Sequence, residues 1–457
     1  MPDFSQIQNE LAAMVGPEHI ETDPDVTTDY SVDQARPKVV IFPSDIEQIA
    51  RVIEYANRKN LAVIPWGSGS KVAMGIPPER LDLVIGTSRL NQVVDIDAAN
   101  LTMTVQAGVT FKEIQSRLTS KEYGCYLPMD PPFCNSATIG GILASNSSGP
   151  RRLLYGLPRD IVLGVRFVAP NGEIVGSGGK TVKNVSGYDI SKLMIGSAGT
   201  LGILCETTLR LLPLPERMET LLLSYESLST AAAFVNRVFE SSLLPAAVEA
   251  MNSSSFSNVG MDGAIRFSAD DQVVAIALEG FVEAVTRMGI EMKEMAQKSG
   301  SKVEALLREE KHNFFWSAIS NLVPSMVERF SRLITLQLNF PISEWEHMMA
   351  FVEETMVGSN LEHAILTHAG SGVSIINVLL GQEDNVITGK AIQAIEKLFA
   401  HGREAGSSLV VQRAPTHLKG DLPIWGETGS DLPMMKRIKQ QLDPSGIMNP
   451  GRFVGGL

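Results

Sequence analysis

The sequence lacks the charge excess and the cysteine pattern that mark several classes of protein. Its 39 lysine and arginine residues are outnumbered by 51 aspartate and glutamate residues, which gives a formal net charge of −12. A nucleic-acid-binding protein normally presents a basic face, so the charge argues against that class. The three cysteines, Cys125, Cys134 and Cys205, have neither the pairing of a disulfide framework nor the spacing of a zinc site.

Long apolar runs are also missing. No stretch of about eighteen apolar residues occurs, which predicts a protein without a transmembrane segment. The first residues, MPDFSQ, lack the basic and apolar regions of a secretion signal. These absences predict a cytoplasmic protein with no nucleic-acid partner. At 457 residues and 44% hydrophobic composition, the chain is long enough for two or three domains with their own cores.

The most distinctive stretch is TIGGILASNSSGPRRLLYG, residues 138–156, which combines glycine with short hydroxyl and amide side chains. Glycine lets a backbone approach a ligand closely, and serine and asparagine add short hydrogen-bonding groups. A phosphate-bearing cofactor would provide partners for such a loop. A glycine-rich turn that only connects two strands is the alternative.

Two other glycine-rich segments accompany this stretch. WGSGSKVAMG, residues 66–75, follows the apolar strand LAVIP and can form an anion nest for a pyrophosphate. Val72 stands where the dinucleotide fingerprint GxGxxG requires its third glycine, and GSGGKT, residues 176–181, has Ile174 where a P-loop requires its first. Residues 183–204 then add a glycine trio, and Asn171-Gly172 predicts a β-hairpin just before them.

These segments together resemble the flavin-binding domain of the vanillyl-alcohol oxidase superfamily, of the p-cresol methylhydroxylase type. The closing DPSGIMNPGRFVGG, residues 443–456, is similar to the ending of the glycolate oxidase and D-lactate dehydrogenase branch. The resemblance implies an α+β fold with a two-part FAD-binding domain over residues 1–215. It also implies a cap over residues 216–411, where alternating strand and helix patterns predict a ferredoxin-like antiparallel sheet with helices on one face. Residues 412–457 are then expected to return to the FAD-binding domain.

The resemblance also implies which residues bind non-covalent FAD. The pyrophosphate is expected at residues 65–70, the adenosine and isoalloxazine along residues 130–146, and the adenine or ribose end at residues 202–203. The predicted FAD contacts are Pro65, Trp66, Gly67, Ser68, Gly69, Ser70, Asp130, Ser136, Thr138, Gly140, Gly141, Ala144, Ser145, Asn146, Gly149, Tyr155, Gly202 and Ile203.

The sequence departs from the family most clearly in the cap. Catalytic relatives of this branch carry His-Ala-Gly-Asp-Gly-Asn-Leu-His, whereas this chain reads THAGSGVSIIN, with Ser371 and Ile375 at the acidic and second histidine positions. Because a metal site needs at least three ligands, no metal is predicted. His368 is the candidate base, and Arg413 or Arg452 is expected to bind a substrate carboxylate. The ending resembles most closely the diverged second flavin subunit of glycolate oxidase.

Three functions therefore remain open. The first is a FAD-dependent oxidoreductase that converts a small 2-hydroxy acid to a 2-oxo acid, in a glycolate oxidase-like complex with partner flavin and iron–sulfur subunits. The second is a FAD-carrying subunit of such a complex with little or no catalysis of its own. The third is a structural or regulatory remnant with an empty flavin cleft. Because His368 lacks its usual companions, we expect the isolated chain to reduce FAD slowly with glycolate or lactate.

Overall fold

The chain folds into two units, each with its own sheets and core. The structure is a computed structural model that describes residues 4–179, 187–261, 265, 267–268, 271–381 and 384–457. The start of the predicted motif at residues 183–204 lies outside these residues. Unit 1 consists of Met1–Ser147, Leu157–Leu214 and Glu427–Leu457, and unit 2 consists of Ser148–Gly156 and Pro215–Gly426. Within the described ranges, no helix is long and apolar enough to cross a membrane.

The first sheet of unit 1 contains a β-α-β unit made of β2, α3 and β3. Its strand order is β1-β2-β4-β3, in which β2, β4 and β3 are parallel and β1 is antiparallel to β2. Helix α3 packs its apolar residues into the core beneath this sheet, together with α1. Asp45 caps α3 by accepting the amide of Gln48. The bounds are α1 (Phe4–Val15), β1 (Ile20–Glu21), α2 (Pro24–Thr28), β2 (Val39–Ile41), α3 (Ile46–Lys59), β3 (Val63–Trp66) and β4 (Leu83–Gly86).

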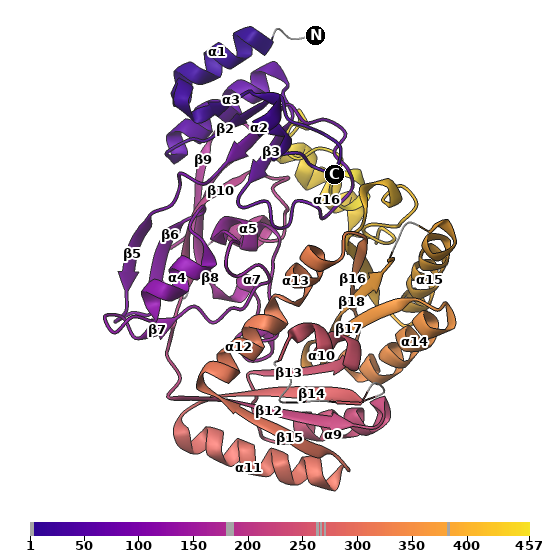
Figure 1. Cartoon of the computed structure of the whole chain (residues 1–457). Helices are drawn as coiled ribbons and strands as arrows, with labels where there is room; N and C mark the ends of the chain where they lie inside the picture. The colour runs from indigo at the N-terminus through magenta and orange to yellow at the C-terminus, as the bar shows by residue number, and fades with distance from the viewer. Residues whose placement is uncertain (1–3, 180–186, 262–264, 266, 269–270, 382–383) are drawn as a thin grey trace. The chain divides into compact units, whose positions relative to one another are not determined.

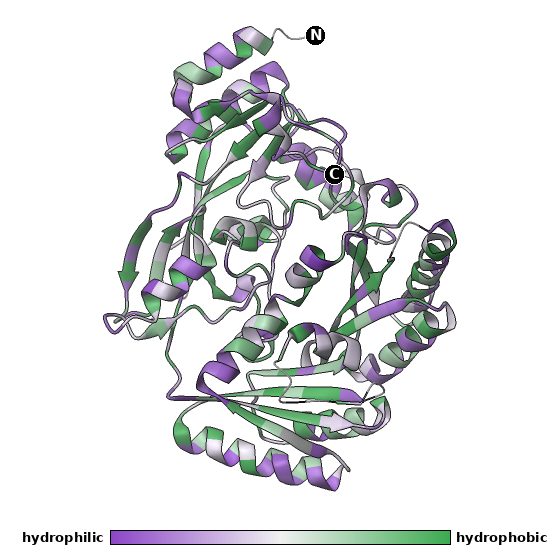
Figure 2. Ribbon diagram, in the orientation of Figure 1, coloured by the Kyte–Doolittle hydropathy of each residue, from purple (hydrophilic) through white to green (hydrophobic). Residues whose placement is uncertain are grey.

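The second sheet of unit 1 is antiparallel, with the order β5-β6-β10-β8-β9. Strands β8 and β9 form the predicted hairpin, and Gly172 in its turn has a φ of 89°, which glycine adopts without steric cost. Short helices contribute to the apolar core of this sheet, and Figure 2 shows the apolar residues along β8 and β10. The bounds are β5 (Val93–Asp97), β6 (Thr102–Gln106), α4 (Phe111–Leu118), β7 (Cys125–Tyr126), α5 (Ile139–Ala144), α7 (Pro158–Ile161), β8 (Val162–Val168), β9 (Ile174–Gly178), α8 (Ile190–Met194), β10 (Ile203–Arg210) and β11 (Leu212–Pro213).

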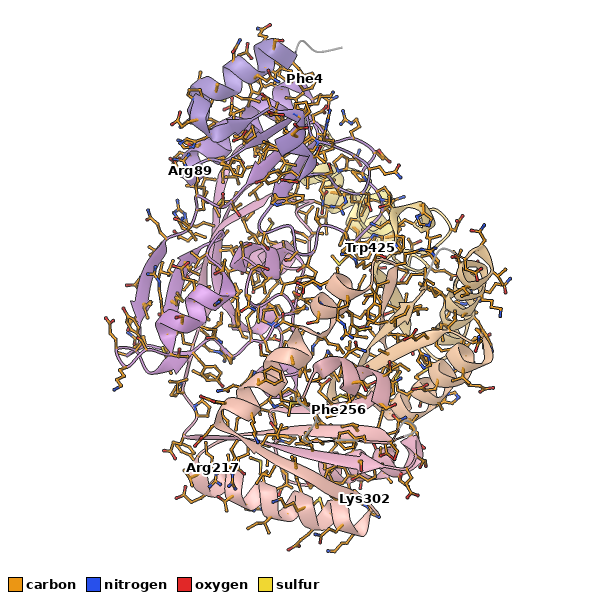
Figure 3. All side chains as sticks on the ribbon, viewed as in Figure 1. Phe4, Arg89, Arg217, Phe256, Lys302 and Trp425 are labelled. Atoms are coloured by element: carbon orange, nitrogen blue, oxygen red, sulfur yellow. The ribbon has the colours of Figure 1, made fainter. Side chains whose placement is uncertain are left out.

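Unit 2 is built on an eight-stranded antiparallel sheet of order β15-β12-β14-β13-β17-β18-β16-β19. Arg217 begins β12 and Lys302 begins β15, and Figure 3 shows these residues at opposite ends of the two paired strands. The strand bounds are β12 (Arg217–Tyr225), β13 (Ala247–Asn252), β14 (Gln272–Gly280), β15 (Lys302–Arg308), β16 (Leu333–Asn339), β17 (Glu362–His368), β18 (Val373–Leu379) and β19 (Ser408–Arg413).

Helices cover both faces of the unit 2 sheet, which corrects the prediction that they lie on one face (Figure 1). One group packs together on one face: α9 (Leu228–Glu240), α11 (Val282–Lys298), α14 (Trp345–Gly358) and α15 (Asn385–Glu404). A second group packs on the other face: α10 (Ser253–Val259), α12 (Glu309–Ser320) and α13 (Leu322–Arg329). The α12 residues Phe315 and Trp316 are buried there, so the strands of unit 2 have apolar neighbours on both sides.

The C-terminal segment returns to unit 1, from Glu427 rather than from the predicted residue 412. After α16 (Leu432–Leu442), the amide of Val63 donates to the Ile447 carbonyl at 2.8 Å, and the amide of Asn449 donates to the Val63 carbonyl at 2.8 Å. Ile447 and Met448 are fully buried in the core beneath the first sheet. The segment thus extends the β3 edge in parallel.

A buried ion pair holds this segment in place. The Lys439 ammonium donates to Asp443 at 2.6 Å and to the carbonyls of Thr200 and Met448, each at 2.8 Å. Asp443 also accepts the amides of Ile447 and Met448. Burial lowers the pKa of Lys439, while the charge of Asp443 opposes that shift.

We expect Asp443→Asn to lower the free energy of unfolding by about 3–5 kcal/mol, because Lys439 would remain buried without its counter-charge. Urea unfolding of the purified protein measures this change. Glu113→Gln is the matched control, since the exposed Glu113–Arg117 pair of α4 should contribute less than about 0.5 kcal/mol. Equal midpoints for Asp443→Asn and the control would contradict this role.

Candidate functional site

Three glycine-rich segments of unit 1 lie directly against one another. A Cβ atom on Gly67 would lie 2.2 Å from Thr138 Oγ1, and one on Gly199 would lie 3.1 Å from the Pro65 ring. The amides of Gly196 and Ala198 donate to the carbonyls at residues 143 and 144, at 2.9 and 2.8 Å. The predicted segments 65–70, 138–146 and 196–202 therefore meet at the ends of β3 and α5.

Local chemistry shapes the middle segment. The Thr138 hydroxyl caps α5 by accepting the Gly141 amide at 3.3 Å. The chain leaves the helix at Asn146, whose φ of 47° lies in the left-handed region that asparagine tolerates. Asn146 Oδ1 and Ser147 Oγ are buried and have no hydrogen-bond partner within the described part of the chain. Since buried polar atoms are normally paired, these two oxygens indicate a ligand at the end of this segment.

Most predicted FAD residues lie in unit 1, but Gly149 and Tyr155 do not. Both belong to the Ser148–Gly156 segment of unit 2. The Gly149 carbonyl accepts a hydrogen bond from Arg152, and the Tyr155 hydroxyl donates to Glu279 at 2.9 Å. The other predicted residues all belong to unit 1: Pro65, Trp66, Gly67, Ser68, Gly69, Ser70, Asp130, Ser136, Thr138, Gly140, Gly141, Ala144, Ser145, Asn146, Gly202 and Ile203.

Arg452 is not placed to bind a substrate carboxylate, which corrects the sequence-based role. Its guanidinium donates to the carbonyls of Val72, Met74 and Ile76 and is 5% exposed. Burial lowers its pKa to about 10, and the charge of Asp33 opposes that shift. Arg452 therefore fixes the loop that follows the first glycine-rich segment.

A histidine–carboxylate pair lies on the unit 2 sheet. Glu249 on β13 is the cross-strand neighbour of His368 on β17, and His368 Nδ1 lies 2.8 Å from each Glu249 carboxylate oxygen. Glu249 is fully buried, and burial raises its pKa well above the ordinary value, against the opposing charge of Arg152. The short contact allows a proton to pass between the two side chains, and a carboxylate whose pKa is strongly raised by burial is typical of functional sites.

A second buried carboxylate lies on the same face of the sheet. Arg151 contacts Glu279 through two nitrogens, at 2.8 and 2.7 Å, and Tyr155 donates to its other oxygen. Burial alone would raise the pKa of Glu279, but Arg151 and Tyr155 outweigh that effect and lower it. His312 on α12 lies 3.8 Å from Glu279, and burial together with Arg151 lowers its pKa to about 4. Glu279 is thus ionised and His312 neutral at pH 7.

Sequence reasoning identified His368 but missed Glu249, Glu279, Arg151 and Arg152. A signal was present, because a charged residue inside the apolar strand pattern AAVEAM must be paired once it is buried. The partner could not be read from the sequence, since the pairing of β13 with β17 joins residues 249 and 368.

Arg413, the other predicted carboxylate-binding residue, is distant from His368. It lies on the edge strand β19 opposite Thr335 of β16, whereas His368 is opposite Val373 on β18. Arg413 is three strands away from β17 and about four residues along it, or roughly 14 Å in each direction. The carboxylate and hydroxyl of one small 2-hydroxy acid cannot span that distance, so Arg413 does not share a site with His368.

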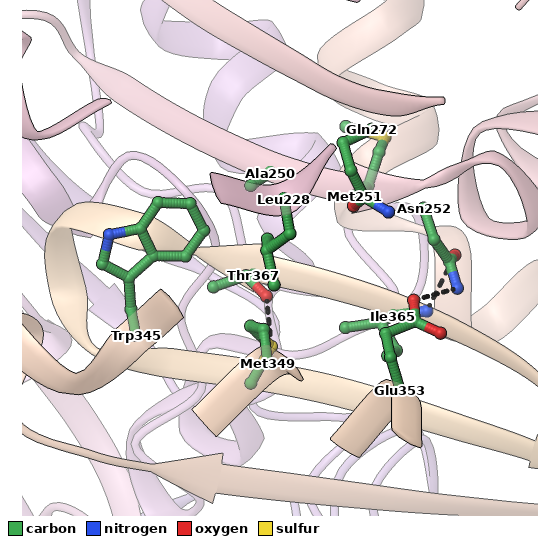
Figure 4. A pocket seen from close by; sticks show the side chains of 10 residues that line it. All are labelled: Leu228, Ala250, Met251, Asn252, Gln272, Trp345, Met349, Glu353, Ile365 and Thr367. Atoms are coloured by element: carbon green, nitrogen blue, oxygen red, sulfur yellow. Dashed lines mark hydrogen bonds between the residues drawn. The ribbon is translucent and has the colours of Figure 1, made fainter. Parts of the chain in front are cut away.

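A small cavity occurs on the opposite face of the unit 2 sheet (Figure 4). Thr367, which precedes His368, points into it and donates to Met349 Sδ at 3.0 Å, and Asn252 donates to Glu353 at 3.1 Å. The cavity has room for about one water molecule, too little for an organic substrate. Among the described residues, no group of three or more His, Cys, Asp or Glu side chains is arranged to hold a metal ion.

Family models match both parts of the chain. The FAD binding domain model matches residues 37–178, and the model of the C-terminal domain of FAD linked oxidases matches residues 214–453, more than half of the chain. The chain belongs to the FAD-linked oxidases. This FAD-linked oxidase is thus a FAD-dependent oxidoreductase of the predicted superfamily.

Individual relatives cover nearly the whole FAD-linked oxidase. It is 29% identical to the glycolate oxidase subunit GlcD of Bacillus subtilis, over 98% of this chain and 96% of the relative. It is 24% identical to a D-lactate dehydrogenase of Anaerostipes hadrus, over 96% and 95%. Substrate-bound p-cresol methylhydroxylase has the same fold, with a TM-score of 0.80, 14% identity and coverage of 98% and 96%. These matches confirm the predicted branch and fold, while the likeness to a second flavin subunit stays a prediction.

The residues of unit 1 fit FAD. Because glycine has no side chain, the backbone of the three segments can be approached closely by a cofactor. The side-chain oxygens of Asn146 and Ser147, which have no hydrogen-bond partner among the described residues, can form hydrogen bonds with polar atoms of that cofactor. Ser68 and Ser70 lie on the loop after β3, where hydroxyls and amides suit a pyrophosphate. These segments therefore fit the predicted FAD site, and the FAD contacts expected for Gly149 and Tyr155 stay predictions.

We expect Gly141→Val to fold but to bind FAD at least about tenfold more weakly, a loss of about 1.4 kcal/mol. Within 4 Å, a Cβ at Gly141 meets only Thr138 Oγ1, at 3.2 Å, so the added methyl groups would extend into the predicted FAD path. The flavin absorbance of dialysed protein measures occupancy. Gly176→Val on β9 is the control, because its Cβ would approach only Arg166, at 4.0 Å. Full FAD retention by Gly141→Val would rule out this path.

We also expect His312 to make stability depend on pH. Its folded pKa of about 4 lies below the ordinary 6.5, so the stability it contributes is complete above pH 6.5 and decreases as the pH falls toward 4. Between pH 7 and pH 5 the expected loss is about 2 kcal/mol. His312→Gln should remove this loss, as measured by urea unfolding at both pH values. An unchanged pH dependence in the variant would assign the loss to another group.

Proposed function

We propose that this FAD-linked oxidase converts a small 2-hydroxy acid to the corresponding 2-oxo acid at the face of the unit 2 sheet that carries Glu249 and His368. The buried Glu249–His368 pair, with the charge of Arg152 acting on it, is the observation that supports the proposal. A proton acceptor beside a cation suits a substrate that carries a hydroxyl next to a carboxylate. The names of the relatives, a glycolate oxidase subunit and a D-lactate dehydrogenase, point to the same class of substrate.

In this proposal, each residue has a distinct role. His368 accepts the hydroxyl proton at Nε2, the ring nitrogen that faces away from Glu249. Glu249 holds Nδ1, and its raised pKa allows it to take up the Nδ1 proton as Nε2 gains the proton of the substrate hydroxyl. Arg152 binds the substrate carboxylate. Bound FAD supplies a two-electron acceptor for the hydride that leaves the α-carbon. The substrate thereby loses two electrons and two hydrogens and becomes a 2-oxo acid.

The pair also bears on whether the chain works alone. The prediction of slow reduction assumed that His368 lacked a partner, and Glu249 provides one from another strand. We therefore favour a chain with catalytic residues of its own over a subunit that only carries FAD. The name of the Bacillus relative, a glycolate oxidase subunit, suggests a complex. Partner flavin and iron–sulfur subunits that take up the electrons remain part of the proposal.

We expect FAD in the purified protein to be bleached under anaerobic conditions by glycolate or D-lactate. His368→Gln should slow the bleaching by about 10²–10⁴-fold, since it removes the general base. His363→Gln is the matched control, because His363 lies on the same strand and contacts its own carboxylate, Glu353, at 2.7 Å. Yellow protein that no 2-hydroxy acid bleaches would favour the FAD-carrying subunit, and colourless protein would favour the remnant with an empty cleft.

A further inference from the structure

The short helix α6 (Arg152–Tyr155) is held on the unit 2 sheet from both of its ends. Before the helix, Arg151 bonds to Glu279 of β14 through two nitrogens. At its last residue, the Tyr155 hydroxyl donates to the second oxygen of the same carboxylate. One side chain, Glu279, therefore fixes both ends of α6.

The middle of α6 has a second point of contact. The helix packs against β13, which carries Glu249, and against the turn that follows His368. A Cβ atom on Gly370 in that turn would lie 2.6 Å from Leu153 Cδ1. Glycine at this position therefore permits the close approach of α6 to the histidine–carboxylate pair.

Glu279 has the properties of a fixed anchor. Its side chain is 1% exposed, and Arg151 and Tyr155 lower its pKa against the effect of burial. Two Arg151 nitrogens contact one oxygen of this carboxylate, and the Tyr155 hydroxyl donates to the other, so both oxygens have partners. Removal of Glu279 would take away the carboxylate that Arg151 and Tyr155 contact, which favours release of the segment.

We propose that Glu279 is a positioning residue that holds α6 so that Arg152 can bind the substrate carboxylate beside His368. Arg152 follows Arg151 directly in the sequence, and its charge acts on Glu249. The backbone carbonyls of Ser148 and Gly149 accept hydrogen bonds from the Arg152 guanidinium and restrict its direction. This inference rests on the proposed function, because it assigns Arg152 to that substrate.

The test compares Glu279→Gln with Glu219→Gln in the FAD-loaded protein. Glu219 is an equally buried carboxylate on the neighbouring strand β12, and it contacts Arg217 and Arg308 instead of α6. We expect Glu279→Gln to raise KM for the 2-hydroxy acid by about tenfold, as the loss of a well-placed charged hydrogen bond does, with kcat changed much less. Glu219→Gln should leave KM unchanged.

Proteolysis tests the same contact without any turnover. The bonds after Arg151 and Arg152 are trypsin sites, and cleavage of a folded protein follows the local opening of the segment. We expect Glu279→Gln to be cut there about tenfold faster than the wild type, the factor that corresponds to about 1.4 kcal/mol of lost anchoring. Tyr155→Phe removes one hydrogen bond to Glu279 and no charge, so it should increase the cleavage rate by a smaller factor. This variant replaces Glu279→Gln in the test if Glu279→Gln does not fold.

Each result has a separate meaning. A KM and a cleavage rate for Glu279→Gln that both match those of Glu219→Gln would overturn the positioning role. Faster cleavage with an unchanged KM would keep the anchor but remove Arg152 from substrate binding. If no 2-hydroxy acid reduces the wild type, the proposed function fails together with the role of Arg152, and the cleavage rates still show independently whether Glu279 anchors α6.

Discussion

The structure of unit 2 depends on the need to pair two carboxylates that are buried on one face of an apolar sheet. An ionised carboxylate away from water is costly unless cations and hydrogen-bond donors surround it. Glu249 contacts His368 on a neighbouring strand. Glu279 contacts Arg151 in the Ser148–Gly156 segment of unit 2, which is flanked in the sequence by parts of unit 1. The requirement for pairing thus brings together a histidine, a cation and a short helix on one face of the sheet.

Unit 1 depends on a different constraint, because the backbones of its three glycine-rich segments must approach one another closely. A side chain at Gly67 would collide with Thr138, and one at Gly199 would press against Pro65 from a backbone with a φ of 72°, so glycine at both positions lets the segments meet. Arg452 and Lys439 then use buried hydrogen bonds to backbone carbonyls to hold the adjoining loop and the C-terminal segment. Both cations therefore have a structural role.

Features that depend on local chemistry could be predicted from the sequence. The hairpin at Gly172 and the glycine-rich segments follow from neighbouring residues, and the resemblance to a known family supplied the fold. The surroundings of Arg413 and Arg452 could not be predicted from the sequence, because a cation's partner depends on strand order and on the folding of distant loops. Glu249 was missed for the same reason, since only the register of β13 against β17 places it beside His368.

The Ser148–Gly156 segment has a consequence for the exchange of caps between related proteins. A chimera that transfers only the contiguous region from Pro215 to Gly426 would carry Glu249 and Glu279 but leave behind Arg151, which pairs with Glu279, and Arg152, whose charge acts on Glu249. The transplanted sheet would then bury carboxylates beside a foreign segment. The cap is therefore encoded by two separate stretches of sequence. A recombination that transfers it intact needs two crossovers around residues 148–156 and two more around residues 215–426.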